Sequence, residues 1–238
     1  MRRITGLLLD VDDTLIDTRA AMVAAGEVAV GALWPELGAQ VRHSVGVHFH
    51  ADPGDFFGRF SSGELSFSEM RLARLADLLA SFSLAAVDNV DELFWDTYTP
   101  AFAANVRLFD DVLALVDAAR AAGIQLGLLT NSSARLTQQK LEITALVDVF
   151  AVVATRDTLG FGKPDARAFH HACRLLGSAP AQTLYVGDHI EIDAIAAGDA
   201  GLSAVWLQRD SGDLEGASSA RLRGIPIVTS LSQVPALW

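Results

Sequence analysis

The sequence predicts an α/β protein in which a doubly wound parallel sheet carries an inserted block of helices. Short apolar runs that end in polar residues, such as 7–9 and 184–186, are typical of buried strands whose ends reach the edge of a sheet. From residue 108 onward these runs alternate with helical patterns, which favours parallel strands covered on both faces. Residues 18–104 interrupt that alternation, so we expect a core domain of 1–17 and 105–238 and a helical domain of 18–104 that serves as a lid.

The insertion begins with an Ala-rich helix over 18–33, which a Trp-Pro pair closes. The following stretch, 38–63, is less periodic, and we expect it to be irregular. It contains His43, His48 and His50, and a His-x-His pair can ligate a metal. Since no cysteine or clustered acid lies beside them, we expect loop or surface histidines instead.

Two further helices complete the insertion. Ser66 and Glu69 have the spacing of a capping box and predict the start of one helix, and the other is expected over 88–102. The residues expected to face the interior are Leu72, Leu75, Leu79 and Phe82 of the first helix and Leu93, Phe94, Tyr98 and Phe102 of the second. Arg71 and Arg74 fall on another face, where they are either solvated or within reach of an anionic substrate.

The core domain is expected to continue with alternating elements. Asp110 and Asp111 are predicted to cap one helix, and Lys163-Pro164-Asp165 to open another with proline in its first turn. The other expected elements are strands near 124–129, 149–153, 184–186, 203–207 and 225–228 and helices from about 134 and 193. Ligands of doubly wound sheets collect outside the carboxyl ends of the strands. We therefore expect the polar residues at those ends to meet, namely Asp10, Asp12, Thr130 and Asp188.

Asp10 and Asp12 follow the first predicted strand directly. Side chains two residues apart on a strand point the same way, so the two carboxylates should converge while Val11 turns back into the protein. Carboxylates packed together repel one another unless a cation lies between them, and a hard divalent cation is the natural candidate. The alternative for this stretch alone is that Asp13 and Thr14 merely cap a turn.

The composition excludes several classes of protein. The 238-residue chain has 29 acidic and 18 basic residues, a net charge of −11, which makes it a poor binder of nucleic acid. Cys173 is the single cysteine, so an intramolecular disulfide is excluded and a reducing cytoplasm is favoured. The apolar run 4–9 is too short for a signal peptide, and no run is long enough for a membrane helix. We therefore expect a cytoplasmic protein without a membrane partner.

Four short motifs follow one another in the chain, each at a predicted strand end or helix start. They are Asp10-x-Asp12-x-Thr14, Thr130 after an apolar strand, Lys163-Pro164, and Gly187-Asp188 with Asp193. In this order they resemble the motifs of the haloacid dehalogenase superfamily, whose core is Rossmann-like, and the match covers essentially the whole chain. The helical insertion after the first motif is similar to the cap of subfamily I.

The resemblance implies a phosphatase that hydrolyses a small phosphorylated metabolite. Asp10 would be the nucleophile and would form an aspartyl-phosphate. Asp12 would be the general acid and base. Thr130 and the backbone N–H of Asn131 would bind phosphate oxygens, and Lys163 would neutralise Asp10 and the charge that grows in the transition state.

The resemblance also implies Mg²⁺ as the cofactor. Asp10, the backbone carbonyl of Asp12, and Asp188 would hold the ion, and Asp193 would support it or its waters. Taken singly, these residues allow plainer interpretations: Lys163 as an exposed residue before a proline, and Asp188 and Asp193 as a turn and a helix cap.

Other functions stay open beside the phosphatase. A 2-haloacid dehalogenase on the same fold needs no metal, but its members typically lack a carboxylate at the place of Asp12 because halide leaves without a proton. A phosphomutase would pass the phosphoryl group to a sugar hydroxyl instead of water. A receiver-like signalling module is also phosphorylated on aspartate, but such modules are shorter and lack the lid, and a scaffold with a decayed site would not keep every catalytic side chain. The natural substrate and the choice between monomer and homodimer stay open.

Overall fold

The computed structural model describes residues 3–210 and 212–238, and the chain divides into two compact units. The core unit consists of Met1–Ile16 and Leu108–Trp238, and the helical unit consists of Asp17–Arg107. The chain therefore leaves the core unit after its first strand and returns to it about ninety residues later.

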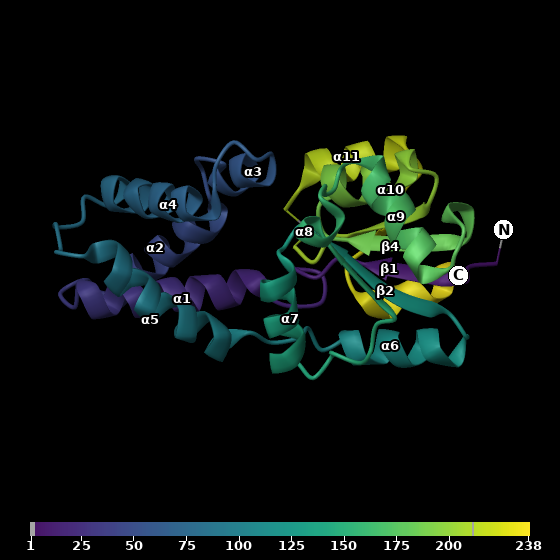
Figure 1. Ribbon diagram of the computed structural model, residues 1–238, viewed down its shortest axis with the longest axis horizontal. Coiled ribbons are helices and arrows are strands. Elements are labelled where there is room, and N and C mark those ends of the chain that lie inside the picture. Colours follow the sequence, from purple (N-terminus) through teal and green to yellow (C-terminus); the bar gives the residue numbers. More distant parts are fainter. Residues whose placement is uncertain (1–2, 211) are drawn as a thin grey trace. The chain divides into compact units, whose positions relative to one another are not determined.

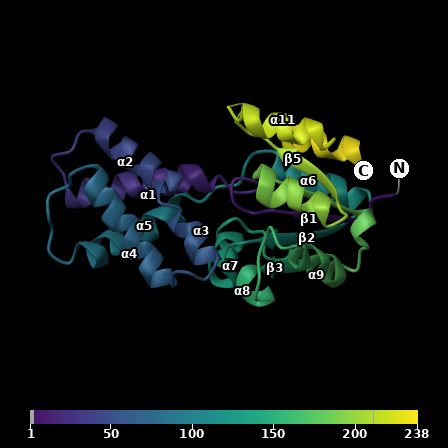
Figure 2. The ribbon, with the colours of Figure 1, turned by 90° about the horizontal axis from the view of Figure 1, so that it is seen from above.

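The core unit is built on six parallel strands in the order β3-β2-β1-β4-β5-β6 (Figures 1 and 2). Their bounds are β1 Gly6–Leu9, β2 Gln125–Thr130, β3 Val152–Thr155, β4 Thr183–Gly187, β5 Ser203–Leu207 and β6 Ile227–Val228. Leu9 of β1 is level with Leu128 of β2 on one side and with Val186 of β4 on the other. The residues that follow β1, β2 and β4 therefore leave the sheet side by side, at the carboxyl ends of the strands, which form the edge where the predicted site residues lie. The predicted fold class is confirmed.

Helices cover both faces of this sheet. They are α6 Val112–Ala121, α7 Ala134–Ile143, α8 Arg156–Leu159, α9 Ala166–Leu176, α10 Ala196–Asp199 and α11 Leu214–Leu222. In Figure 1, α9 and α10 lie above the strands and α6 lies below them. Leu8, Phe169 and Tyr185 are fully buried in one cluster between the sheet and α9, which explains the apolar character of the strands. No helix of the described residues is long and apolar enough to cross a membrane.

The helical unit contains α1 Thr18–Leu33, α2 Ala39–Ala51, α3 Phe56–Ser61, α4 Phe67–Ser81 and α5 Val90–Asn105. Its interior is aromatic. Phe94 is fully buried, and its ring centroid lies 5.7 Å from that of Phe49, 5.3 Å from that of Trp95 and 5.6 Å from that of Tyr98. Such ring contacts add to the free energy gained from burying the rings, so this cluster holds the unit together.

The expectation of an irregular stretch over 38–63 is wrong, because α2 and α3 lie there. Val45 and Phe49 are one helical turn apart in α2 and both are buried, a pattern too short to stand out among the polar residues around it. His43 lies 2.6 Å from a carboxylate oxygen of Glu27, and His48 lies 2.8 Å from one of Asp77. These histidines face single acids from a helix.

The predicted interior faces of two helices are partly wrong. The capping box of Ser66 and Glu69 does begin α4, but Leu72 is 48% exposed, as is Leu93 of α5 at 45%. The buried residues of α4 are Met70, Leu75 and Leu78. Arg74 belongs to this inner face, since its guanidinium donates to the carbonyl of Phe49 and its Nε lies 3.4 Å from Asp52 Oδ1. A half-buried arginine with backbone and acid partners shifts the face that apolar spacing alone predicts.

Two helix starts in the core unit also differ from the prediction. Asp111 precedes α6, but its side chain makes no capping hydrogen bond and accepts instead from Arg209, Ser230 and the N–H of Leu231. Helix α9 begins at Ala166 with Asp165 as its N-cap, so Pro164 stands before the helix and not in its first turn. The strand expected over 149–153 is β3, and α11 was not expected.

Candidate active site

The first motif leaves the sheet through a tight turn. The N–H of Asp10 donates to the carbonyl of Val186 at 2.9 Å, which continues the pairing of β1 with β4 by one residue. Asp13 then takes a left-handed conformation with φ of +54°, which aspartate tolerates better than most residues. Val11 is fully buried, as expected. Asp10 is buried as well, and Asp12 is half-buried.

Three carboxylates from two distant parts of the chain meet at this edge. Asp10, Asp188 and Asp193 each offer an oxygen, and these atoms all lie within 4.8 Å of one another. Asp10 follows β1 and Asp188 follows β4, and Trp206 donates its indole N–H to the carbonyl of Asp188 at 2.7 Å. The predicted convergence of positions 10 and 188 is therefore present in the structure.

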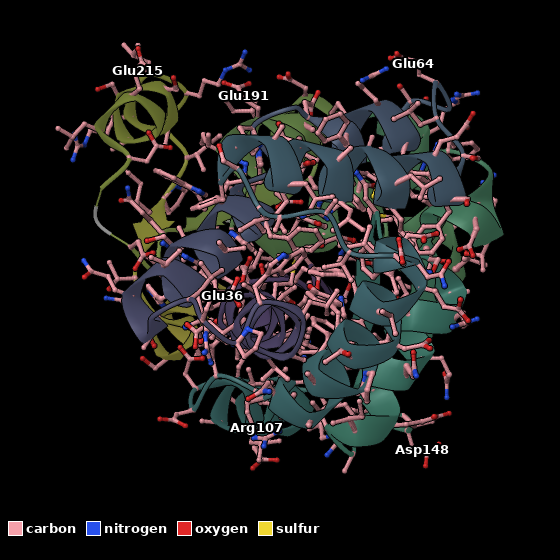
Figure 3. The ribbon with its side chains drawn as sticks, turned by 90° about the vertical axis from the view of Figure 1, so that its left-hand side faces the viewer. Glu36, Glu64, Arg107, Asp148, Glu191 and Glu215 are labelled. Carbon is pink, nitrogen blue, oxygen red and sulfur yellow. The ribbon has the colours of Figure 1, made fainter. Side chains whose placement is uncertain are left out.

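Asp193 lies in Ile190–Ile195, a single π-helical segment that follows β4. Glu191, two residues earlier, is exposed and points outward (Figure 3), whereas Asp193 is 1% exposed. A Cβ on Gly187 would collide with the carboxylate of Asp193, so the glycine of this motif leaves room for the acid. The backbone N–H of His189 donates to Asp193 Oδ2 at 3.0 Å and fixes its orientation.

Lys163 is the cation of the cluster. Its Nζ donates to Asp10 Oδ1 at 2.6 Å, to Asp193 Oδ1 at 2.5 Å and to the hydroxyl of Tyr185 at 2.9 Å. The residue is 7% exposed, so the plainer interpretation of an exposed residue before a proline is wrong. All three hydrogen-bond donors of the ammonium have partners, which is what a buried charge requires.

Asn131 holds the backbone of Lys163 in place. Its side-chain amide donates to the carbonyl of Lys163 at 2.8 Å, and its side-chain oxygen accepts from the N–H of the same residue at 2.8 Å. Asn131 follows Thr130, the last residue of β2, which is 2% exposed. The second and third motifs are thus joined by a pair of hydrogen bonds between loops 32 residues apart in sequence.

Burial and an excess of negative charge shift the pKa values of the cluster. Burial raises the pKa of Asp10 to about 7, with the charges of Asp193 and Asp12 acting in the same direction and Lys163 opposing them. Burial and the charges of Asp10, Asp193 and Asp13 raise the pKa of Asp188 to about 9. Burial alone would lower the pKa of Lys163, but the carboxylates of Asp10 and Asp193 raise it.

Asp12 has a separate set of partners. Ser132 donates its hydroxyl to Asp12 Oδ2 at 2.7 Å, and Lys140 donates its Nζ to Asp12 Oδ1. The N–H of Ser132 also donates to Thr130 Oγ1 at 3.1 Å, so this serine connects Thr130 with Asp12. Both oxygens of the Asp12 carboxylate therefore accept hydrogen bonds from the segment that follows β2.

Sequence reasoning missed three residues of this site: Ser132, Lys140 and Tyr185. Tyr185 lies in the middle of β4, and its hydroxyl, which carries a single proton, lies 2.9 Å from Asp193 Oδ1 and 3.2 Å from the carbonyl oxygen of Leu129. A phenol hydroxyl in a fully buried strand requires a polar partner, and that signal was available in the sequence. Ser132 and Lys140 gave no such signal because their environment depends on where α7 packs.

The donor set suits a hard divalent cation. The carboxylate oxygens of Asp10 and Asp188 are ligands that Mg²⁺ prefers, and the family resemblance implies the carbonyl of Asp12 as a further one. Both oxygens of Asp193 already accept hydrogen bonds, from Lys163, Tyr185 and the N–H of His189. Bound charge would also oppose the repulsion that raises the pKa values of Asp10 and Asp188. The residues at this edge therefore fit a metal ion, with Asp193 supporting its neighbours.

Comparison with known proteins places the chain among the hydrolases. A family model described as haloacid dehalogenase-like hydrolase matches residues 4–201. The chain therefore belongs to the haloacid dehalogenase-like hydrolase family, and the resemblance inferred from its four motifs is confirmed.

Individual relatives extend over most of the chain. The phosphoglycolate phosphatase of Thiobacillus denitrificans is 28% identical over 201 residues, which cover 83% of this chain and 80% of that protein. A crystal structure of the hydrolase YfnB of Bacillus subtilis bound to magnesium aligns over 99% of each chain with a TM-score of 0.78 and 21% identity. The structure of a dehalogenase aligns over 100% of this chain and 98% of its own with a TM-score of 0.76 and 21% identity. At such identities the two structural matches show the fold alone.

Proposed function

We propose that this hydrolase is a Mg²⁺-dependent phosphatase that acts on a small phosphorylated metabolite through an aspartyl-phosphate on Asp10. The observation that carries the proposal is the distance of 2.6 Å between Lys163 Nζ and Asp10 Oδ1 inside a cluster of acids. A phosphate dianion approaches such a cluster only if cations balance the carboxylates. The similarity to a phosphoglycolate phosphatase over most of the chain supports the same reaction class.

In the first step, an oxygen of Asp10 attacks phosphorus. The new bond joins Asp10 Oδ to phosphorus, and the bond between phosphorus and the ester oxygen breaks. Asp12 gives its proton to the departing oxygen, so the alcohol leaves neutral. Thr130 and the N–H of Asn131 donate to the phosphate oxygens, and Lys163 balances the negative charge on the group in transfer.

In the second step, water attacks the aspartyl-phosphate. Asp12 takes a proton from the water as the new bond to phosphorus forms, and the bond from phosphorus to Asp10 breaks. Inorganic phosphate leaves, Asp10 is restored as a carboxylate, and Asp12 holds the proton for the next cycle. Asp12 thus serves as acid and then as base.

Mg²⁺ held by Asp10, Asp188 and the carbonyl of Asp12 would supply positive charge to the phosphate oxygens and lower the pKa of the neighbouring carboxyls. Asp193 would keep Lys163 oriented toward Asp10, since one Asp193 oxygen accepts from that ammonium at 2.5 Å.

The dehalogenase alternative fits these residues less well. Halide departs without a proton, so the displacement of halide gains nothing from an acid at the place of Asp12. Here Asp12 is present and has two hydrogen-bond donors directed at its carboxylate. This observation favours phosphoryl transfer.

A phosphate-release assay tests the proposal. Phosphorylated sugars, nucleotides and organic acids, together with p-nitrophenyl phosphate, are incubated with the enzyme in Mg²⁺ and in EDTA. We expect release with Mg²⁺, loss of release in EDTA, and loss of at least about 10⁴-fold in Asp10→Asn, because the nucleophile is removed. Unchanged turnover in Asp10→Asn, or release of halide from 2-haloacids with no release of phosphate, would contradict the proposal.

A further inference from the structure

The chain uses lysine at only two positions. Of its 18 basic residues, 16 are arginines, and the two lysines are Lys140 and Lys163. Both lysines are buried, at 5% and 7% exposure. Both are ion-paired with aspartates of the first motif, Lys163 with Asp10 and Lys140 with Asp12. The proposed function gives Lys163 a role but leaves the second pair without one.

Lys140 lies in the last turn of α7 and not in a loop. Its side chain is 6% exposed, whereas that of its partner Asp12 is 28% exposed. The lysine therefore contacts Asp12 from the protein side and leaves the other side of the carboxylate accessible. Arginine carries a wide planar fork, while lysine is a compact point charge on a flexible stem, which suits a narrow approach to one oxygen.

Stability alone does not explain this pair. Taking an ammonium and a carboxylate out of water is costly, and apolar residues of similar volume often serve a fold as well or better. A helix that needed only to pack could carry methionine or leucine at this position. The second donor to Asp12, the Ser132 hydroxyl at 2.7 Å, comes from the same segment, so two side chains are directed at one acid.

We propose that Lys140 is a positioning residue for Asp12, holding its carboxylate toward the leaving group together with Ser132. The inference rests on the proposed function, in which Asp12 gives a proton to the departing oxygen. When that proton leaves, a negative charge develops on Asp12, and the Lys140 ammonium already lies against it. The interaction therefore strengthens as the proton moves, which is the condition for lowering the barrier.

This role predicts a dependence on the leaving group. A nitrophenolate leaves readily without a proton, whereas a phenolate with an electron-donating substituent gains much more from protonation. Loss of Lys140 should therefore matter little for p-nitrophenyl phosphate and strongly for p-methoxyphenyl phosphate, two esters of similar size. A residue that only supported the fold would affect both esters equally.

The test compares Lys140→Met with the wild-type enzyme on 4-nitrophenyl, phenyl and 4-methoxyphenyl phosphate in Mg²⁺, with kcat/KM as the readout because it reports the first transfer step. Methionine keeps the length of the stem and removes the charge. We expect a loss below about 3-fold for the nitrophenyl ester that grows to about 10²-fold for the methoxyphenyl ester. The matched control is Arg135→Met on the same helix, where the exposed arginine should leave all three values unchanged.

Each outcome decides the inference. A loss that grows as the leaving group becomes more basic supports it, and an equal loss on all three esters, or no loss, overturns it. Turnover by the wild-type enzyme and its abolition in Asp10→Asn test the proposed function separately. If the proposed function holds and Lys140→Met behaves as the wild type, only the role of Lys140 is wrong.

Ser132→Ala provides a second variant in case Lys140→Met does not fold. It removes one neutral hydrogen bond to Asp12, so we expect the same leaving-group trend with a smaller loss, about 3- to 10-fold on the methoxyphenyl ester. The contact itself is visible by NMR, since selective ¹⁵N labelling of the lysine side chains gives signals from two residues in the whole chain. Asp12→Asn should shift the Lys140 signal more than that of Lys163, and an unmoved Lys140 signal would overturn the inference.

Discussion

The two units of the molecule bury different kinds of side chain. At the edge of the core sheet, Asp10, Lys163 and Asp193 are each at most 7% exposed and are held by hydrogen bonds among themselves. In the helical unit, 17–107, the structure describes every residue and none of the charged ones is fully buried, while Phe94 and its ring neighbours fill the interior. Burying rings stabilises a fold, whereas burying charges costs free energy. We infer that the core unit keeps a charge cluster that costs free energy because the proposed phosphoryl transfer uses it.

Replacing Lys163 by methionine should have the largest effect on both stability and phosphate release. Asp10 and Asp193 would lose their cation while staying buried, so we expect a loss of about 3–5 kcal/mol in the free energy of unfolding. Phosphate release should fall by about 10³-fold or more, because the charge opposite the transferred group is gone. Urea unfolding and the phosphate assay measure the two effects.

Arg167→Met is the control for that variant. Arg167 is exposed and pairs with Asp165 at the start of α9, close in sequence to Lys163. The free energy of unfolding should change by less than about 0.5 kcal/mol and phosphate release should be unaffected. If Lys163→Met were as mild as this control, the buried cluster would not be a functional cation site.

Phe94→Ala tests the other side of the comparison. The ring is fully buried among three aromatic neighbours, so its removal should cost about 3–5 kcal/mol, and Phe94→Leu should cost clearly less because it leaves a smaller cavity. Urea unfolding followed by tryptophan fluorescence measures this loss, since Trp34 and Trp95 belong to the helical unit. A cost below about 1 kcal/mol would show that the aromatic cluster does not hold the unit together.

The acidic cluster also predicts how stability depends on pH. The pKa values of Asp10 and Asp188 rise from 3.8 to about 7 and about 9 in the folded chain. Between pH 3.8 and about 9 the folded protein binds more protons than the unfolded protein. The metal-free protein should therefore lose stability as the pH rises through this range. Mg²⁺ offsets the repulsion, and its stabilising effect should grow over the same range.

Asp188→Asn separates the effect of the acidic cluster on stability from the effect of Mg²⁺. In EDTA at pH 8 the wild-type Asp188 has to bind a proton or bear a repelled charge when the protein folds, whereas the amide of the variant does neither, so its Tm should exceed that of the wild type by about 2–4 °C. With Mg²⁺ the order should reverse, because the variant has lost a ligand. Thermal unfolding at several pH values, with and without Mg²⁺, measures both effects. A wild-type Tm that ignores Mg²⁺ at every pH would argue against a metal at this edge.

The core unit could be predicted from sequence because its strands and motifs are local patterns. Each apolar run that ends in Asp10, Thr130 or Asp188 predicts a buried strand and the polar residue at its end from a few consecutive residues. The register of β1 with β2 and β4 then brings those ends together. Fold class and family were therefore accessible before any coordinates.

The remaining errors concern residues whose roles depend on distant partners. Asp111 stands where a helix cap is expected, but Arg209, 98 residues further on, takes its carboxylate. Arg74 lies on the inner face of α4 because it donates a hydrogen bond to the carbonyl of Phe49 and pairs with Asp52. Apolar spacing cannot show such partners. In the sequence Lys140 has the pattern of an ordinary helical lysine, because its partner Asp12 is far away along the chain. Tertiary hydrogen bonds of this kind leave no periodic trace in a sequence.

The most direct test of the account is to look for the phosphoryl group on Asp10. The Asp12→Asn variant can still form the intermediate from a good leaving group such as p-nitrophenyl phosphate, but it lacks the base that activates water. Acid quenching after mixing with this ester and Mg²⁺, followed by peptide mass spectrometry, should find one phosphoryl group on the peptide that contains Asp10. A phosphoryl group on another residue, or an unmodified Asp10 in a variant that still releases p-nitrophenol, would contradict the account.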